Sequence, residues 1–240
     1  MKWRSLEESN PSSDTRPLRE IFAERRELIA NYVPQDVRAI HSRVVEQLRQ
    51  MGTSQEALRV GTKITEFQLS DQNGKIVSSS QFLAGGPLVV SFIRGRWCPF
   101  CVGQLEAMNL RYYEITDAGA AFIAISPQTV QQSFFMADQH KLRFPLLSDP
   151  GNQVARKFGL VYRVPEYQQT IYKRAFVNLP LANGDGSWEL PIPATFVIGA
   201  EGTVVYASAS EDYTDRPEPA EILQALTSFS HQAGQNPPVR

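Results

Sequence analysis

Cysteine, histidine, net charge and long apolar runs are all scarce in this chain. Its 240 residues include two cysteines and three histidines, and 24 basic side chains nearly balance 25 acidic ones, which leaves a net charge of −1. Such a balance provides no electrostatic field that would attract nucleic acid or an anionic membrane. The first residues lack the apolar core of a signal peptide, and no run approaches the ~20 apolar residues of a membrane helix. We expect a cytoplasmic protein that binds neither nucleic acid nor membrane.

The remaining composition is that of a globular protein, with 42% hydrophobic and 20% charged residues. Residues 1–58 predict an N-terminal helical arm, in which a helix from Pro17 stops at Pro34 and a second helix ends near Gly52. The apolar face of this arm predicts docking on the main domain or on a second subunit, as in a homodimer.

The main domain is predicted to span residues 59–230, followed by a disordered tail at 231–240. Short apolar runs alternate with helical periodicity, which is typical of an α/β fold with a central, partly parallel sheet covered by helices. The expected strands are 64–69, 75–77, 87–93, 120–126, 144–148, 192–198 and 203–208, and the expected helices are 80–83, 99–117, 128–142, 153–158 and 218–229. Residues 160–191 are irregular and aromatic, and predict either a lid that faces a substrate or a packing extension.

Both cysteines lie where the strand 87–93 gives way to a helix, in the sequence Arg94-Gly95-Arg96-Trp97-Cys98-Pro99-Phe100-Cys101. Pro99 suits the first helical position, which makes Cys98 the N-cap. A thiolate there would accept backbone N–H groups and face the positive end of the helix dipole, and Arg94 and Arg96 would lower its pKa further. Because the second sulfur lies within about one helical turn, the pair can close a disulfide and reopen it. The pattern predicts a redox dithiol, with Trp97 shielding it.

Three other interpretations of the pair are weaker. A structural disulfide across so short a loop would remove little entropy from the unfolded chain. A zinc site would need two more ligands, and His41, His140 and His231 are far apart in sequence. Two inert core cysteines are the third alternative. We expect no metal and no cofactor.

The dithiol at a helix start, the α/β rhythm and a proline before a late strand together resemble the thioredoxin fold. Within that fold, residues from about 60 to 229 resemble the alkyl hydroperoxide reductase and thiol-specific antioxidant family, in particular its peroxiredoxin-like members with a Trp-Cys-Pro-aromatic-Cys motif. Stretches that support the resemblance are Ala124-Ile125-Ser126-Pro127, residues 144–152, residues 181–188 and Asp212-Tyr213-Thr214.

The resemblance implies roles for individual positions. It places the cis proline of the fold, beside the dithiol, at Pro193, where an exposed backbone edge would pair with a substrate. It also places the peroxide-attacking cysteine of ordinary peroxiredoxins at Cys101 and their active-site threonine at Cys98. Their active-site proline falls on Arg94, and the arginine before their late strand falls near Pro193. This chain therefore resembles a peroxiredoxin scaffold that carries a thioredoxin-like dithiol.

The function implied is an antioxidant thiol oxidoreductase that reduces hydroperoxides or disulfides through Cys98 and Cys101. A thiol reductant, such as a thioredoxin or glutathione system, would regenerate it. The cap position favours Cys98 as the attacking sulfur, whereas the family comparison favours Cys101. The alternative is a redox sensor or binding protein whose dithiol switches a partner interaction.

Overall fold

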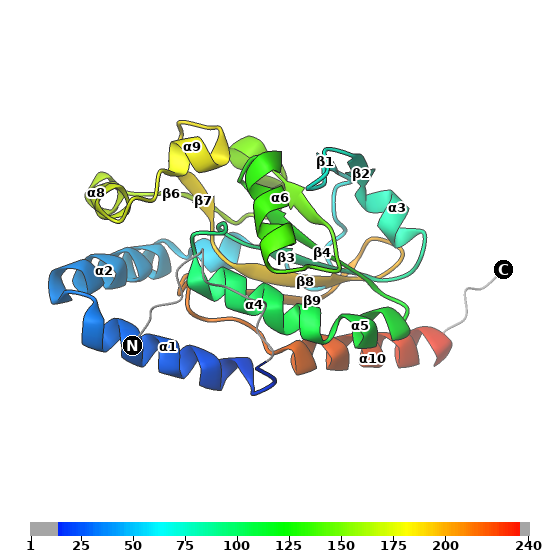
Figure 1. Cartoon of the computed structure of the whole chain (residues 1–240). Helices are drawn as coiled ribbons and strands as arrows, with labels where there is room; N and C mark the ends of the chain where they lie inside the picture. Colours follow the sequence, from blue (N-terminus) through cyan, green and yellow to red (C-terminus); the bar gives the residue numbers. More distant parts are fainter. Residues whose placement is uncertain (1–13, 236–240) are drawn as a thin grey trace.

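The computed structural model describes residues 14–235, and the side chains of residues 14–229 (Figure 1). The α-helices are α1 (Leu18–Tyr32), α2 (Gln35–Met51), α3 (Ser79–Leu83), α4 (Pro99–Leu110), α5 (Tyr112–Asp117), α6 (Val130–Gln139), α7 (Gln153–Lys157), α8 (Glu166–Arg174), α9 (Leu179–Asn183) and α10 (Pro219–Gln235). The strands are β1 (Gln68–Ser70), β2 (Ile76–Ser78), β3 (Leu88–Phe92), β4 (Ala121–Ser126), β5 (Leu146–Ser148), β6 (Val161–Arg163), β7 (Glu189–Pro191), β8 (Ala194–Ile198) and β9 (Val204–Ala209). Short 3-10 turns cover Thr53–Glu56 and Pro150–Asn152.

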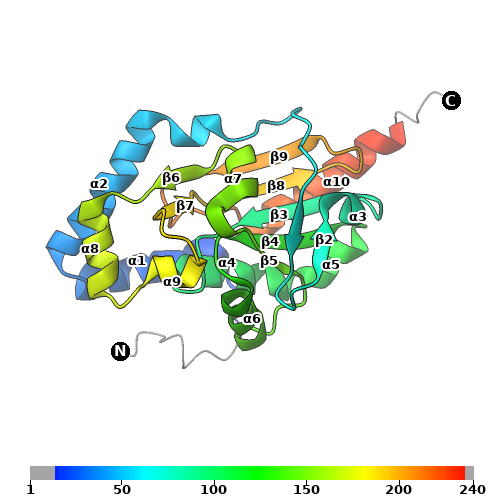
Figure 2. The same ribbon diagram turned by 90° about the horizontal axis from the view of Figure 1, so that it is seen from above.

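Seven strands form one mixed sheet in the order β2-β1-β5-β4-β3-β8-β9 (Figure 2). Strands β3, β4 and β5 run parallel, and β8 and β9 add an antiparallel edge beside β3. The central strand β3 is wholly buried, as its run of apolar and β-branched residues requires when both faces are covered. This arrangement confirms the expected mixed α/β sheet.

Alternate residues of β3 enter two separate hydrophobic cores. Leu88, Val90 and Phe92 pack with α2, α7 and the β6–β7 hairpin on one face of the sheet. Val89 packs on the other face with α1, α4, α6 and α10. The period-two alternation of the strand thus distributes apolar side chains to both layers. Cys98 and Cys101 belong to the second core.

The N-terminal arm packs on the chain's own main domain. In Figure 1, α1 runs beneath α4 and α2 lies beside α8. Leu18 and Phe22 of α1 are buried in the core around α4, and Val44 and Leu48 of α2 are buried in the core of the opposite face. Of the two docking sites expected for the apolar face of the arm, the structure shows the intramolecular one.

Three expectations differ from the structure. The helix expected over 99–117 divides at Arg111 into α4 and α5. Residues 160–191 are not irregular, because they form α8, α9 and a β6–β7 hairpin. Helix α10 continues through Gln235, so the tail expected to be disordered from residue 231 is helical at its start, and residues 236–240 lie outside the described part.

The prediction of a cis peptide bond before Pro193 is wrong, because every peptide bond in the described residues is trans. The chain instead passes in extended form from β7 into β8. The Ile192 N–H donates to the Leu160 carbonyl at 2.8 Å, and the Pro193 carbonyl accepts the Ser210 N–H at 3.2 Å. Since Pro193 is buried and its carbonyl is already paired, it offers no free edge to a substrate.

Candidate dithiol active site

The dithiol lies at the carboxyl end of β3, where an open parallel sheet commonly carries its site. Gly95 makes the turn from strand to helix with φ of +141°, and a Cβ there would come within 2.7 Å of the Trp97 indole nitrogen. Glycine is the residue that this backbone conformation favours. The chain then enters α4 with Cys98 as N-cap and Pro99 at its first position, as predicted.

Both sulfurs are free thiols, and both cysteines are 0% exposed. The Cys98 sulfur accepts a hydrogen bond from Arg94 Nη2 at 3.1 Å and another from the Cys101 thiol. Burial alone would raise the pKa of Cys98, but the Cys101 hydrogen bond and the charges of Arg94 and Arg216 outweigh it and hold the pKa well below its ordinary value. The side chain makes no capping bond to the helix N–H groups, so arginine and thiol donors replace the expected backbone donors.

The Cys101 sulfur has a different environment. It accepts the backbone N–H of Arg94 at 3.4 Å and lies 3.5 Å from Arg216 Nη2. Burial, the hydrogen bond it donates to Cys98 and the negative charge on Cys98 together raise the pKa of Cys101 well above its ordinary value. Cys98 is therefore the more acidic sulfur of the pair, and Cys101 is its proton donor.

Arg94 is 3% exposed and is enclosed by aromatic rings. Its guanidinium carbon lies 4.3 Å from the centre of the Tyr213 ring and 5.0 Å from that of Trp97, and its Nη1 donates to the Tyr172 hydroxyl at 3.4 Å. Burial by itself lowers the pKa of Arg94, but the negative charge of Cys98 raises it above its ordinary value, so the side chain is a cation. Within the described residues, no carboxylate forms an ion pair with it.

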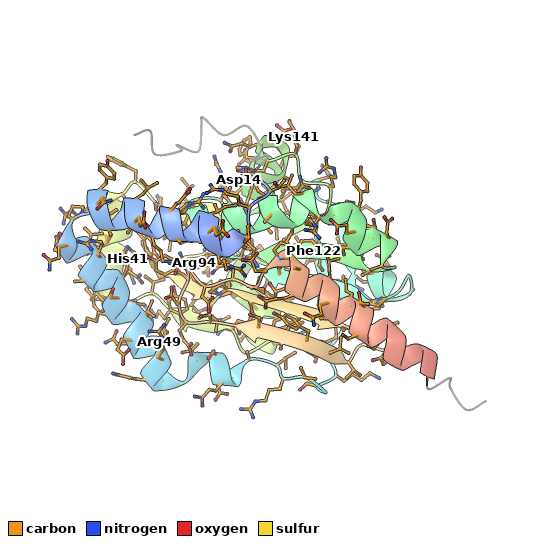
Figure 3. All side chains as sticks on the ribbon, turned by 90° about the horizontal axis from the view of Figure 1, so that it is seen from below. Asp14, His41, Arg49, Arg94, Phe122 and Lys141 are labelled. Atoms are coloured by element: carbon orange, nitrogen blue, oxygen red, sulfur yellow. The ribbon has the colours of Figure 1, made fainter. Side chains whose placement is uncertain are left out.

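The N-terminal arm closes one side of the site. His41 of α2 packs against the rings of Tyr172 and Tyr213, and its Nδ1 is hydrogen-bonded to Gln168 at 3.0 Å. Figure 3 shows His41 close to Arg94. Burial and the charge of Arg94 lower the pKa of His41 to about 4, so the imidazole is neutral near pH 7.

Helix α1 contacts the start of α4 directly. The Phe22 ring meets the Phe100 ring edge-on at 5.0 Å, and the Arg25 guanidinium donates to the Pro99 carbonyl. These contacts cover the start of α4, which carries the two cysteines.

Most of the predicted supporting residues lie at the dithiol, but Arg96 does not. Arg94, Trp97 and Pro99 lie at the dithiol. Arg96 does not, because its N–H and its Nη1 donate to Gln128 and Gln132 beside α6, both at 3.0 Å. The expectation that Arg96 stabilises the thiolate therefore has no support in its contacts.

Sequence reasoning missed Arg216, His41, Tyr172 and Tyr213 as parts of the site. They come from the loop after β9, from the arm and from α8, so no local motif joins them to the cysteines. The one available signal was the stretch Asp212-Tyr213-Thr214, which carries the family resemblance and ends two residues before Arg216.

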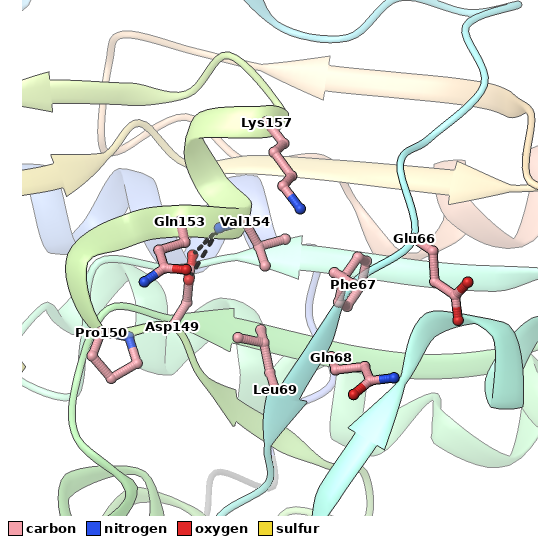
Figure 4. A pocket seen from close by; sticks show the side chains of 9 residues that line it. All are labelled: Glu66, Phe67, Gln68, Leu69, Asp149, Pro150, Gln153, Val154 and Lys157. Carbon is pink, nitrogen blue, oxygen red and sulfur yellow. Dashed lines mark hydrogen bonds between the residues drawn. The ribbon is translucent and has the colours of Figure 1, made fainter.

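A separate cleft of about 420 Å³ is lined by Glu66, Phe67, Asp149, Gln153 and Lys157 among others (Figure 4). The Asp149 carboxylate accepts the N–H groups of Val154 at 3.0 Å and Ala155 at 2.9 Å, which fixes the start of α7. This acid therefore serves the backbone, and no residue of the dithiol site lines the cleft. In the described part of the chain, no group of three or more His, Cys, Asp or Glu side chains could hold a metal ion, and no helix is long and apolar enough to cross a membrane.

The sheet order and the pair of thiols at the start of the helix after β3 define a protein of the thioredoxin fold. Solved structures share this fold. The peroxidoxin BcpB from Mycobacterium tuberculosis superposes with a TM-score of 0.58 at 24% identity, over 72% of this chain and 98% of that one. A peroxiredoxin Q from Xanthomonas campestris superposes with a TM-score of 0.54 at 22% identity, over 68% and 91%.

Residues 60–207 match the model of the AhpC/TSA family, and the chain belongs to that family. A chloroplastic peroxiredoxin Q from Sedum lineare is 37% identical over 100 residues, which is 42% of this chain and 53% of that protein. One from Triticum aestivum is 37% identical over 100 residues, 42% of this chain and 46% of that protein. The chain thus spans about half the length of these relatives.

Proposed function

We propose that the protein is a thiol peroxidase of the peroxiredoxin type, in which Cys98 attacks a hydroperoxide and Cys101 resolves the product as a disulfide. The observation that carries this proposal is the unequal pair of sulfurs, with Arg94 Nη2 3.1 Å from Cys98 and the pKa of Cys98 lowered while that of Cys101 is raised. Only a thiolate is an effective nucleophile, which favours Cys98 over Cys101 as the attacking residue.

The Cys98 thiolate attacks the terminal oxygen of the hydroperoxide, the O–O bond breaks, and the alcohol or water leaves with a proton. Cys98 becomes a sulfenic acid. The Cys101 sulfur then attacks the Cys98 sulfur, hydroxide leaves and is protonated to water, and a Cys98–Cys101 disulfide remains. An external thiol reductant, of the thioredoxin or glutathione type, returns two electrons and two protons to the pair.

The burial of both sulfurs favours a small hydroperoxide over a protein disulfide as oxidant, because 0% exposure leaves a large partner no direct approach. Exchange with the reductant then requires the cover made by the arm, Tyr172 and Tyr213 to open. The expected location is a compartment with reducing thiol systems, of which the cytoplasm is the simplest candidate.

Purified protein with hydrogen peroxide or a small disulfide, and a thiol reductant in excess, tests the proposal. We expect catalytic consumption of peroxide, a bridged Cys98–Cys101 peptide in mass spectra, and loss of turnover in Cys98→Ser. Turnover of the disulfide without peroxide consumption would refute the peroxidase assignment. A single stoichiometric oxidation without turnover would support a redox sensor instead.

A further inference from the structure

The two sulfurs are each served by a different arginine. Arg94 belongs to the motif and contacts Cys98, whereas Arg216 comes from the loop between β9 and α10 and contacts Cys101 through its Nη2 at 3.5 Å. The other nitrogens of Arg216 are also held, since Nη1 donates to the carbonyls of Tyr213 at 2.6 Å and Asp215 at 2.7 Å. Among the described residues no carboxylate forms an ion pair with Arg216, so no acidic side chain neutralises the positive charge that it brings to the Cys101 sulfur.

Gln104 sets the orientation of Arg216. It lies on α4 one turn after Cys101 and is 0% exposed, and its Oε1 accepts Arg216 Nε at 2.9 Å. The other end of the amide donates to Thr195 Oγ1 at 3.0 Å, which is hydrogen-bonded to Ser91 Oγ at 2.9 Å. Because the amide nitrogen of Gln104 is tied to the sheet through Thr195 and its oxygen holds Arg216, the arginine is fixed against Cys101 by the core and not by its own loop alone.

We propose that Arg216, positioned by Gln104, is the cation of the resolving step, which stabilises Cys101 as a thiolate once Cys98 has been oxidised. The inference rests on the proposed function and assigns one arginine to each of its two steps. Arg94 stabilises the thiolate of the attacking Cys98, and Arg216 stabilises the thiolate of Cys101 once the negative charge has moved there.

The charge moves because Cys101 is the proton donor nearest to the reacting sulfur. When Cys98 attacks, the Cys101 thiol that was hydrogen-bonded to it supplies the proton that the leaving alkoxide takes up. Cys98 is then a neutral sulfenic acid and Cys101 a thiolate, which attacks the Cys98 sulfur and expels hydroxide. The sum is one thiolate, one thiol, one hydroperoxide and one proton giving one disulfide, one alcohol and one water.

The other polar groups near Cys101 cannot take the place of Arg216. Cys98 has lost its charge at this stage, and Tyr162 of β6, Tyr172 of α8 and Tyr213 have pKa values that burial raises, so they stay neutral. His41 of α2 is neutral as well, and Arg94 is placed on Cys98 by its Nη2. Arg216 remains the one cation among these groups whose side chain lies on the Cys101 sulfur.

The test separates the two steps in the full-length protein. Arg216→Met, Gln104→Leu and Gln104→Glu are compared with wild type, and Arg143→Met serves as control because Arg143 is an exposed arginine that donates to the Asn109 carbonyl away from the dithiol. Each protein is mixed with hydrogen peroxide and sampled over time. Dimedone traps and counts the sulfenic acid in each sample, and N-ethylmaleimide counts the free thiols that remain. Far-UV circular dichroism checks that each variant is folded.

In Arg216→Met we expect disulfide formation to slow about 10- to 100-fold, as the thiolate fraction of Cys101 falls by about tenfold for each unit its pKa rises. Sulfenic acid should accumulate and over-oxidised Cys98 should appear. The first step should slow by a smaller factor than resolution, because Arg216 also lowers the pKa of Cys98 but Arg94 stays bound to the Cys98 sulfur. The pH at which resolution reaches half its maximum should move upward. Gln104→Glu keeps the acceptor for Arg216 but adds a counter-charge and loses the donor to Thr195, so it should also slow resolution.

Unchanged disulfide formation in folded Arg216→Met and Gln104→Glu, or equal slowing of both steps, would overturn the proposal. A second arm starts from a mixed disulfide of Cys98 with glutathione, which Cys101 resolves without any peroxide. If wild type does not react with peroxide but Arg216→Met still slows the release of glutathione, the peroxidase assignment fails and the role of Arg216 stands.

Discussion

The Arg94 guanidinium is the positive charge that lowers the pKa of Cys98 most. It is buried, it donates to the sulfur at 3.1 Å, and no carboxylate in the described residues competes for its charge. Its aromatic surroundings add cation–π attraction that keeps the side chain in place.

Arg94→Met should therefore raise the pKa of Cys98 and reduce peroxide reactivity at pH 7 about 100-fold. Titration of thiolate absorbance near 240 nm in the Cys101→Ser background checks the pKa. Arg96→Met is the matched control, because Arg96 is bound to Gln128 and Gln132. An equal effect of both substitutions would show that the arginines act through general surface charge.

The same pKa shift gives the reduced protein a defined pH dependence. The folded pKa of Cys98 lies well below the ordinary value of 9.0, so between these two values the folded protein binds fewer protons than the unfolded chain. Its contribution to stability is full near pH 9 and is lost as the pH falls through the folded pKa of Cys98. Above pH 9 the raised pKa of Cys101 acts in the opposite direction. Denaturant unfolding across pH 5–10 should show stability rising with pH up to about 9 in wild type, and rising less in Arg94→Met.

At the scale of elements, the N-terminal arm is part of the site. Helix α1 covers the start of α4 through Phe22, which is 2% exposed, and α2 supplies His41 beside Arg94. Removal of the arm's anchor should therefore loosen the cover of the dithiol and not merely detach a peripheral helix.

Phe22→Ala should cost about 3–5 kcal/mol of packing between α1 and α4. Alkylation of Cys98 and Cys101 by N-ethylmaleimide in the folded protein should accelerate at least about tenfold, since local opening no longer has to break this contact. Phe176→Ala is the control, because Phe176 is 97% exposed. If alkylation is equally slow in both variants, the cover is made by α8 and the loop after β9 without the arm.

For the molecule as a whole, oxidation should lower stability. The disulfide removes the negative charge of Cys98, which compensates the buried Arg94 and the nearby Arg216, while the short loop that it closes contributes little entropy. A stranded buried charge costs about 3–5 kcal/mol. For a chain of this size that corresponds to a lower melting temperature by roughly 10 °C.

Calorimetry of the protein reduced with excess dithiol and of the protein oxidised with one equivalent of peroxide measures this difference. Arg94→Met should reduce the difference in melting temperature between the two forms, because its oxidised form has no uncompensated charge at position 94. An oxidised wild type that melts at or above the reduced form would show that the guanidinium finds another partner or water after oxidation. We expect the reduced protein to melt at a higher temperature than the oxidised protein. A fold that stabilises the reduced state also makes the dithiol a comparatively oxidising couple.

The sequence by itself determined most of the elements and the place of the two cysteines in the fold. The apolar run 87–93, the break at Gly95 and the Cys98-Pro99 start of a helix are local patterns, and local geometry places both sulfurs at the end of β3. Periodicity likewise located the two arm helices, because proline stops and an αL glycine at Gly52 act within a few residues. The resemblance of residues 60–229 to the family likewise rested on short local motifs and on the order in which they follow one another along the chain.

Only the tertiary structure decided the electrostatics. Arg94 and Arg96 look equivalent in sequence, yet the turn at Gly95 directs one side chain onto Cys98 and the other toward α6. Arg216 reaches Cys101 across 115 positions of chain, which no period or spacing records. The extended trans path through Pro193 was likewise set by pairing with Leu160 and Ser210, partners distant in sequence. Charge and hydrogen bonding act through space over a few ångströms, so the protonation state of each sulfur follows from which distant segments the fold brings to it.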